Sequence, residues 1–315
     1  MTAFDLVGNT PLVELKKISG ELQGVSIWAK AEFRNLSGSV KDRAAKAMLL
    51  EGISSGKLRP GKTIIDASSG NTGISYAVLG AVLGYPVTIY LPANASWERK
   101  TILACYGAAV VETSPLEGSD GAFLAVRAEA EAGAERYFWP NQYNNDANWK
   151  AHYDTTGVEI WEQTGGRVTH FICGMGTSGT FMGVSRRLKE YNRNIKAIAV
   201  QPDSPFHGIE GTKHMASTIK PGFYDETFPD RFALANTEAA YAMTRRLALE
   251  EGLFTGISSG ANVQAALELG RALPRGSLVV TLLCDSGFRY LSESFWPGPF
   301  RPESSSPESL GKEGK

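Results

Sequence analysis

Short runs of β-branched and other apolar residues alternate along this chain with longer segments of helical periodicity. The pattern is typical of parallel strands joined by helical crossovers, because a tight turn cannot connect parallel neighbours. The first series has predicted strands at 63–67, 87–91 and 109–112, with helices from about residue 72, after Ser96 and after Ser119. The second has predicted strands at 168–173, 195–200 and 278–283, with helices after Gly179 and at 238–251 and 261–273. We therefore predict an α/β fold with two domains, each a mostly parallel twisted sheet flanked by helices.

The domain division is predicted from the segment between the two series. Residues 136–148 are rich in aromatic residues and asparagine, and they are the best candidate for the crossing between the sheets. We expect a smaller α/β domain over residues 35–145 and a larger one over residues 1–34 plus 146–300. Residues 301–315 contain proline, serine and charged residues with little to bury, so this tail is predicted to be disordered.

The charge balance restricts the partners. The chain has 32 basic and 33 acidic residues, so it lacks the basic excess that binding to nucleic acid or to an anionic membrane surface requires. No apolar stretch is long enough to span a bilayer, and no basic region precedes an apolar run at the start. We therefore expect a cytoplasmic protein that acts on a small molecule.

The cysteines and histidines do not indicate a metal site. Cys105, Cys173 and Cys284 are far apart and lie within or beside apolar runs, which favours reduced, buried thiols over disulfides or metal ligands. The four histidines show no metal-ligand spacing. We expect no bound metal.

One lysine follows a turn of small residues at the start of a predicted helix. Residues 35–43 read Asn-Leu-Ser-Gly-Ser-Val-Lys-Asp-Arg, and the helical run continues over residues 44–50. Near a helix N-terminus the dipole disfavours the protonated amine, which helps Lys41 to act as a nucleophile toward a carbonyl. A solvated surface lysine is the alternative that this segment leaves open.

A second turn lies directly between a predicted strand and a predicted helix. Residues 68–73 read Ser-Ser-Gly-Asn-Thr-Gly, and such a turn presents backbone N–H groups to an anion such as a carboxylate. Asn71 adds an amide that can hydrogen-bond a second polar group. The alternative is a simple helix cap, since Ser, Asn and Thr are all good N-cap residues.

A third turn, residues 174–180, reads Gly-Met-Gly-Thr-Ser-Gly-Thr and also follows a predicted strand. Its glycines let the backbone close around a phosphate, and its hydroxyls add donors. The same letters satisfy Gly-x-Gly-x-x-Gly, so a nicotinamide-dependent oxidoreductase is the competing interpretation. Against that alternative, the turn lies in the middle of the chain, and Asp203 is the only nearby acid that could bind a ribose.

Taken together, these segments resemble the cysteine synthase family, the O-acetylserine sulfhydrylases. The resemblance runs from Gly-Asn-Thr-Pro-Leu at residues 8–12 to Arg-Tyr-Leu-Ser at 289–292, with the motifs in family order and spacing. It implies the fold type II of pyridoxal-phosphate enzymes, similar to the tryptophan synthase β-subunit. It also implies pyridoxal 5'-phosphate as the cofactor and a homodimer.

The resemblance assigns a role to each candidate residue. Lys41 is similar to the lysine that forms the Schiff base with the cofactor, and it would also be the catalytic base. The cofactor would further contact Asn71, the phosphate turn of Gly176, Thr177, Ser178, Gly179 and Thr180, and Ser258 at the pyridine nitrogen. The substrate carboxylate would be bound by Ser68, Ser69, Gly70, Asn71, Thr72 and Gln142. For the serine pair at 258–259 helix capping is the alternative.

The implied reaction is a β-replacement. The acetoxy group of O-acetyl-L-serine would leave to give an aminoacrylate, and sulfide would add to its β-carbon to give L-cysteine. A neutral hydroxyl such as that of Ser258 cannot hold a protonated pyridine as a carboxylate can, so the ring is a weaker electron sink. This favours rapid elimination over a long-lived carbanion.

Several features leave the exact substrates and partners open. Ser68 replaces the threonine frequent in the family, and residues 156–161 with Cys284-Asp285 look more like the B-type isozymes, which accept sulfur donors beyond sulfide. Lys213 lies where related enzymes contact the leaving group and would suit the phosphate of O-phosphoserine, unless it is an exposed loop lysine. Other nucleophiles would give cystathionine or another β-substituted alanine. Family members also bind the C-terminal tail of serine acetyltransferase.

Overall fold

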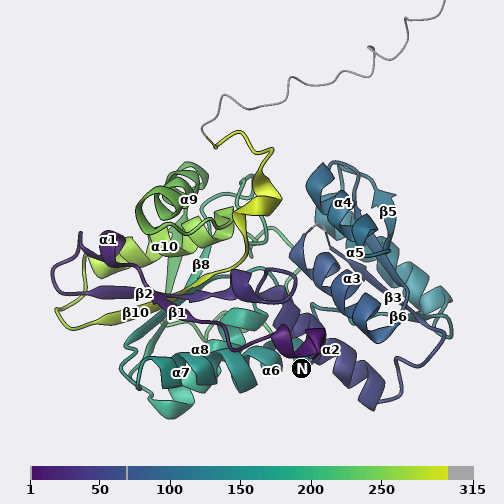
Figure 1. The fold of residues 1–315 in the computed structure, drawn as a ribbon, viewed down its shortest axis with the longest axis horizontal. Helices are drawn as coiled ribbons and strands as arrows, with labels where there is room; N and C mark the ends of the chain where they lie inside the picture. The colour runs from purple at the N-terminus through teal and green to yellow at the C-terminus, as the bar shows by residue number, and fades with distance from the viewer. Residues whose placement is uncertain (1, 69, 297–315) are drawn as a thin grey trace, which may run out of the picture.

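The computed structural model describes residues 2–68 and 70–296. Ser69 and the tail predicted to be disordered lie outside the described residues. The α/β class is confirmed: Figure 1 shows two sheets side by side, each flanked by helices. Among the described residues, no helix combines the length and the apolar character needed to cross a bilayer.

The smaller sheet has four parallel strands in the order β5-β4-β3-β6. These strands are β3 (Thr63–Ala67), β4 (Val87–Pro92), β5 (Ala109–Thr113) and β6 (Tyr137–Phe138). Successive side chains of a strand point to opposite faces, and Ile64 and Ile65 belong to two different core clusters. One cluster holds α2 and α3 against the sheet, and the other holds α5. Their bounds, with that of the neighbouring α4, are α2 (Lys41–Ser54), α3 (Asn71–Leu83), α4 (Trp97–Cys105) and α5 (Gly118–Ala132).

The larger sheet has six strands in the order β1-β2-β10-β7-β8-β9. These are β1 (Leu12–Glu14), β2 (Ser26–Ala31), β7 (His170–Gly174), β8 (Lys196–Pro202), β9 (Arg231–Ala235) and β10 (Leu278–Leu283). Only the edge strand β1 is antiparallel to its neighbour among the described strands. The strand β10 is buried on both faces, as expected where helices cover both sides of a parallel sheet.

Helices cover both faces of the larger sheet (Figure 1). Val279 packs in one core cluster with residues of α9 and α10, and Val280 packs in another with residues of α7 and α8. The bounds are α1 (Lys16–Ser19), α6 (Ala147–Ala151), α7 (Gly157–Gln163), α8 (Gly179–Tyr191), α9 (Thr237–Glu251) and α10 (Ile257–Gly270). A π-helical turn, η3 (His152–Thr156), joins α6 to α7, and short 3₁₀ turns are η1 (Ala3–Leu6), η2 (Glu32–Arg34) and η4 (Gly287–Tyr290).

The predicted elements are found, with shifts at their ends. The helix predicted from residue 261 begins at Ile257, and the strand predicted from residue 168 begins at His170. The sequence did not predict β1, β2, β6 or β9. The predicted crossing segment leads from β6 into α6, which contacts α2 and α8.

The prediction that all three cysteines are buried is confirmed for Cys173, holds only in part for Cys284, which is half-buried, and is wrong for Cys105. This residue is exposed at the end of α4, whereas Leu103 of the same helix is buried. Two positions along a helix correspond to a rotation of about 200°, so these side chains point in nearly opposite directions. An apolar neighbourhood in the sequence therefore did not imply burial of the thiol.

Candidate active site

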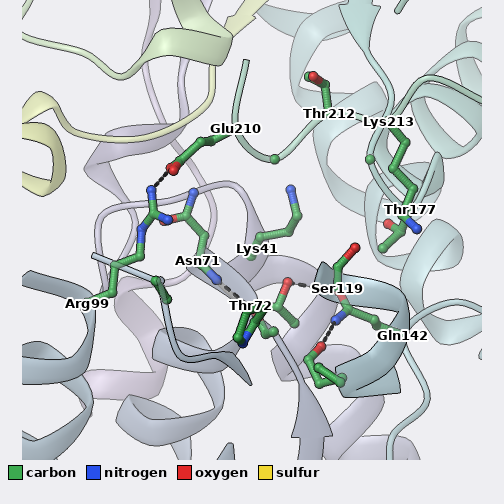
Figure 2. A pocket seen from close by; sticks show the side chains of 18 of the residues that line it. Lys41, Asn71, Thr72, Arg99, Ser119, Gln142, Thr177, Glu210, Thr212 and Lys213 are labelled. Atoms are coloured by element: carbon green, nitrogen blue, oxygen red, sulfur yellow. Dashed lines mark hydrogen bonds and ion pairs between the residues drawn. The ribbon is translucent and has the colours of Figure 1, made fainter. Parts of the chain in front are cut away.

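The carboxyl ends of the parallel strands in both sheets open onto one cavity of about 360 Å³. The turn after β3 and the turn after β7 both line it, as expected for ligand sites in open α/β sheets. Figure 2 shows the Lys41 side chain pointing into the space between these turns. A smaller cavity of about 30 Å³ continues behind it, lined by the 174–180 turn, Ser258 and Cys284.

Lys41 is the first residue of α2, which is the position that the sequence predicted. The backbone before it is fixed by a hydrogen bond of 2.8 Å from Val40 N to Cys284 O. The residue after it, Asp42, is buried and accepts a hydrogen bond of 2.5 Å from Ser75. The chain around Lys41 is thus held from both sides while the amine lines both cavities.

Asn71, the first residue of α3, is held by residues from the far end of the chain. Its Nδ2 donates to Asp285 Oδ2 at 2.7 Å, and its Oδ1 accepts a hydrogen bond from Arg289. An amide nitrogen carries two hydrogens, so one can still be donated to a bound group. The sequence did not predict these two anchors, although Asp285 stood out as a B-type feature.

Gln142 lies beside the turn after β3, as the resemblance implied. Its Nε2 donates to Ala67 O at 2.9 Å, and its Oε1 accepts a hydrogen bond of 2.9 Å from Thr72. The loop that carries Gln142 is anchored by Trp139 Nε1, which donates to Asp66 Oδ1 at 3.0 Å. The structure therefore brings Thr72 and Gln142 together on the wall of the larger cavity.

Ser68 acts as a cap within this turn. Its hydroxyl oxygen accepts hydrogen bonds from Gly73 N at 2.9 Å and from Gly70 N at 3.3 Å. Ser68 therefore binds backbone N–H groups at the start of α3 as a cap would, although the N-cap residue is Gly70, and both residues also line the cavity. The residue between them, Ser69, lies outside the described part of the chain.

The turn at residues 174–180 forms a cradle at the N-terminus of α8. A Cβ at Gly176 would lie 2.3 Å from the carbonyl oxygen of Gly211, so only glycine fits there. Ser178 has a positive φ of 62° and a buried hydroxyl that no group in the described residues hydrogen-bonds. A helix N-terminus with hydroxyl donors is a ready-made phosphate site, and the orphaned Ser178 hydroxyl fits one.

Ser258 lies in the first turn of α10 and lines the smaller cavity with Cys284. The N-cap residue of this helix is Gly256, and Ser258 lies two residues inside it, so the capping alternative does not account for Ser258. Burial raises the pKa of the Cys284 thiol to about 11, although the charge of Lys41 opposes that shift. Both groups therefore present neutral hydrogen-bonding atoms to the cavity at neutral pH.

Two ion pairs of opposite polarity join the helices of the smaller sheet to residues 210–213, which line the cavity. Arg99 of α4 pairs with Glu210, as Figure 2 shows, and Asp120 of α5 pairs with Lys213 at 3.4 Å. Lys213 also lies 4.7 Å from the centre of the Tyr143 ring. The alternative of an exposed loop lysine is wrong, because Lys213 is only 9% exposed. Burial lowers the pKa of its amine, and Asp120 opposes that shift.

The donor set fits one kind of cofactor. That cofactor is a phosphorylated aldehyde with a heteroaromatic ring. The cradle matches its phosphate, the amine in reach of the same cavity matches its aldehyde, and the neutral polar groups beyond match its ring. In residues 2–68 and 70–296, no cluster of three or more His, Cys, Asp or Glu side chains could hold a metal ion. Fold and site together define a pyridoxal-phosphate-dependent enzyme.

Comparison with known proteins identifies the family. The pyridoxal-phosphate dependent enzyme family matches residues 3–285. The cysteine synthase of Aquifex aeolicus is 51% identical, covering 94% of this chain and 92% of its own, and the cysteine synthase B of Salmonella typhimurium is 41% identical, covering 92% and 94%. The crystal structure of cysteine synthase from Entamoeba histolytica superposes with a TM-score of 0.88 at 36% identity, covering 94% and 90%. The chain belongs to the cysteine synthase family, and its cofactor is pyridoxal phosphate. This excludes the nicotinamide interpretation of residues 174–179.

Proposed function

We propose that this enzyme replaces the acetoxy group of O-acetyl-L-serine by sulfide and so produces L-cysteine and acetate. Its 51% identity over most of the chain to a cysteine synthase supports this reaction. The observation that carries it is the position of Lys41, whose amine lines the cavities of both the phosphate cradle and the Thr72–Gln142 wall. A single amine there can serve both the cofactor and the amino-acid substrate.

The roles of the cofactor-binding residues follow from their places in the two cavities. We assign Lys41 to the aldehyde carbon, Asn71 to the phenolic oxygen and Ser258 to the pyridine nitrogen. The phosphate is assigned to the backbone and hydroxyls of Gly176, Thr177, Ser178, Gly179 and Thr180. When bound, the cofactor supplies an electron-accepting ring that acidifies the α-C–H bond of the amino acid and lets the β-substituent leave. The amine of Lys41, once free, is the base for the α-proton.

The substrate carboxylate is assigned to the turn after β3. The N-terminus of α3 offers backbone N–H groups and a positive dipole end to an anion. Gln142 and Thr72 already share a hydrogen bond and would be turned together toward the carboxylate. We assign Ser68, Ser69, Gly70 and Asn71 to the same anion site.

The leaving group is proposed to be acetate rather than phosphate. Lys213 is the lysine that could bind the phosphate of O-phosphoserine, but its charge is already paired with Asp120. An ammonium that is already paired with a carboxylate binds a second anion more weakly than an unpaired ammonium does. O-phosphoserine and nucleophiles that lead to cystathionine or other β-substituted alanines remain the alternative substrates.

The wider organisation is also proposed from the resemblance. We assign residues 35–145 to a smaller domain and residues 1–34 plus 146–300 to a larger one, with the active site between them. The enzyme is proposed to act as a homodimer in the cytoplasm. The C-terminal tail of serine acetyltransferase, which ends in a carboxylate, is the proposed regulatory ligand of the substrate anion site.

The test combines spectroscopy with turnover. Purified enzyme with pyridoxal phosphate should show the visible absorption of a lysine-bound cofactor, and O-acetylserine with sulfide should give cysteine faster than O-phosphoserine does. Lys41→Ala should lose the absorption band and about 10³-fold or more of the rate, because both cofactor anchor and base are gone. The exposed Lys57→Ala variant is the matched control. Cysteine formation by Lys41→Ala at the rate of the control would disprove the proposal.

A further inference from the structure

Two buried polar residues lie directly behind the hydroxyls of the phosphate cradle. Asn148 of α6 and His152 at the start of η3 are four residues apart, so they face the same side of the helical segment. They are 3% and 1% exposed. Neither lines either of the two active-site cavities, so any effect on a bound group must pass through the residues that they touch.

Asn148 donates a hydrogen bond to a cradle hydroxyl. Its Nδ2 lies 2.7 Å from the carbonyl oxygen of Gln142, which can only accept, so this atom is the amide nitrogen. The same Nδ2 lies 3.1 Å from Thr177 Oγ1. The Thr177 oxygen therefore receives a hydrogen bond from behind.

His152 makes the corresponding contact with the other cradle threonine. Its Nε2 lies 3.2 Å from Thr180 Oγ1, and its Nδ1 lies 3.0 Å from Thr156 Oγ1. Burial lowers the pKa of His152 well below its usual value, and the charges of Arg43 and Lys41 lower it further. The ring is therefore neutral and has one donor and one acceptor nitrogen.

Close helix packing makes these contacts possible. A Cβ at Gly183 of α8 would lie 2.2 Å from the Trp149 carbonyl oxygen and 2.8 Å from His152 Cβ, so a glycine is required there. A Cβ at Gly179 would likewise lie 2.0 Å from Asn148 Oδ1. The π-helical turn that begins at His152 is the kind of local irregularity that often occurs at functional sites.

We propose that Asn148 and His152 are positioning residues that orient the hydroxyl hydrogens of Thr177 and Thr180 toward the cofactor phosphate. Each donates a hydrogen bond to a threonine oxygen, so the hydrogen of that hydroxyl is left to point away from its donor and into the cradle. In this arrangement Thr156 donates to Nδ1 and the ring carries its hydrogen on Nε2. The inference rests on the phosphate-binding role proposed for this turn.

The test measures cofactor retention in the holoenzyme. His152→Leu and Asn148→Asp should each raise the dissociation constant of pyridoxal phosphate about tenfold or more. The reason is that a threonine hydroxyl of the cradle then no longer points its hydrogen at the charged phosphate, so that hydrogen bond is lost. His152→Gln can place an amide N–H near the Nε2 position and should recover much of the affinity. His170→Leu is the matched control, since the Nδ1 of His170 also contacts a threonine hydroxyl, at 2.8 Å, but outside the cavity linings.

Two further measurements separate positioning from folding. In a Thr180→Val background, His152→Leu should add little, because the hydroxyl that it orients is already absent. Nitrogen-15 NMR of the wild-type holoenzyme should show the His152 hydrogen on Nε2. The inference is overturned if that hydrogen is on Nδ1, or if the variants retain the cofactor as the His170→Leu control does.

The outcomes also distinguish this inference from the proposed reaction. A wild-type enzyme that makes cysteine, with variants of undiminished cofactor affinity, would overturn only the positioning roles. The opposite result is also informative. If the wild-type enzyme makes no cysteine from O-acetylserine and sulfide, but the variants bind the cofactor more weakly than it does, the positioning roles are supported and only the reaction is overturned.

Discussion

Asn71 and Asp285, 214 positions apart in the chain, are joined by a hydrogen bond of 2.7 Å between Nδ2 and Oδ2. The same Oδ2 accepts a hydrogen bond of 2.6 Å from the hydroxyl of Tyr290, and Arg289 donates to the oxygen of the Asn71 amide. The segment that follows β10 therefore fixes the orientation of an amide at the turn after β3. The two sheets are linked at the point where cofactor and substrate are proposed to meet.

Removing this acceptor should loosen the turn. Asp285→Ala would leave the Asn71 amide and the Tyr290 hydroxyl without their shared partner, which is expected to cost about 1–3 kcal/mol of unfolding free energy. Misplacement of Asn71 should lower kcat/KM for O-acetylserine about 10- to 100-fold. Asp285→Asn keeps an acceptor oxygen and should lose less on both measures. Equal losses in the two variants would show that the charge, not the acceptor, is what matters.

A buried charge cluster joins β2, α2 and α7 and should make stability depend on acid pH. Glu159 accepts hydrogen bonds of 2.6 and 2.8 Å from Arg43 and lies 2.6 Å from the Lys30 amine. Burial alone would raise the pKa of Glu159, but these cations outweigh it and hold the pKa at about 2, below its ordinary 4.5. The stabilisation is therefore complete above about pH 4.5 and is lost as the pH falls toward 2, on the order of 3 kcal/mol in total.

Glu159→Gln tests this cluster. Denaturant unfolding should show a loss of about 3 kcal/mol at pH 7, and the difference from wild type should shrink as the pH is lowered through 4.5 toward 2. Glu51→Gln, which breaks an exposed pair with Lys57, should cost less than about 1 kcal/mol at either pH. A loss from Glu159→Gln that does not change with pH would contradict the assigned ionisation.

Asp66 should have the opposite dependence on pH. Burial raises the pKa of this carboxyl to about 6 from 3.8, so the folded state favours the protonated form. Its contribution to stability is present below pH 3.8 and is lost as the pH rises through 6, about 3 kcal/mol in total. Asp66→Asn keeps an acceptor for Trp139 and should be more stable than wild type at pH 7 but not at pH 4. Unfolding curves at the two pH values test this, and an equal difference at both would refute it.

Local pattern was enough to predict the units that carry the site. The strands β3 and β7 are short apolar runs followed at once by turn residues. The apolar run and the turn residues both indicate a strand that ends there, so no knowledge of the tertiary structure was needed. The strand β2 was not predicted, because it contains Lys30, whose buried amine is paired with Glu159 and also donates to Gln163 and to the Thr10 carbonyl oxygen, all distant in the sequence. Without such partners, a lysine in a short apolar run indicates a segment that is exposed to solvent.

The same distinction holds within the site. The positions of Lys41, Asn71 and the turn from Gly176 were predictable, because each lies at the start of a helix that local pattern indicates, whereas their roles stay predictions that the resemblance implies. The contacts of Asn148 and His152 with the cradle were not, since they depend on how closely α6 and α8 approach. The burial of Lys213 was missed for the same reason, because Asp120 and Tyr143 belong to distant segments.

The ion pair between Asp120 and Lys213 makes a sharp prediction about the leaving group. Lys213 is buried on the cavity wall, and its ammonium lies 3.4 Å from the Asp120 carboxylate. Asp120→Asn should free that charge to bind a phosphate while leaving the shape of the wall nearly unchanged. With sulfide as nucleophile, the ratio of kcat/KM for O-phosphoserine to that for O-acetylserine should rise about tenfold. A change of that size corresponds to the free energy of one hydrogen bond to a charged group. Adding Lys213→Met should abolish the rise, and a gain that survives in the double variant would show that Lys213 is not the phosphate ligand.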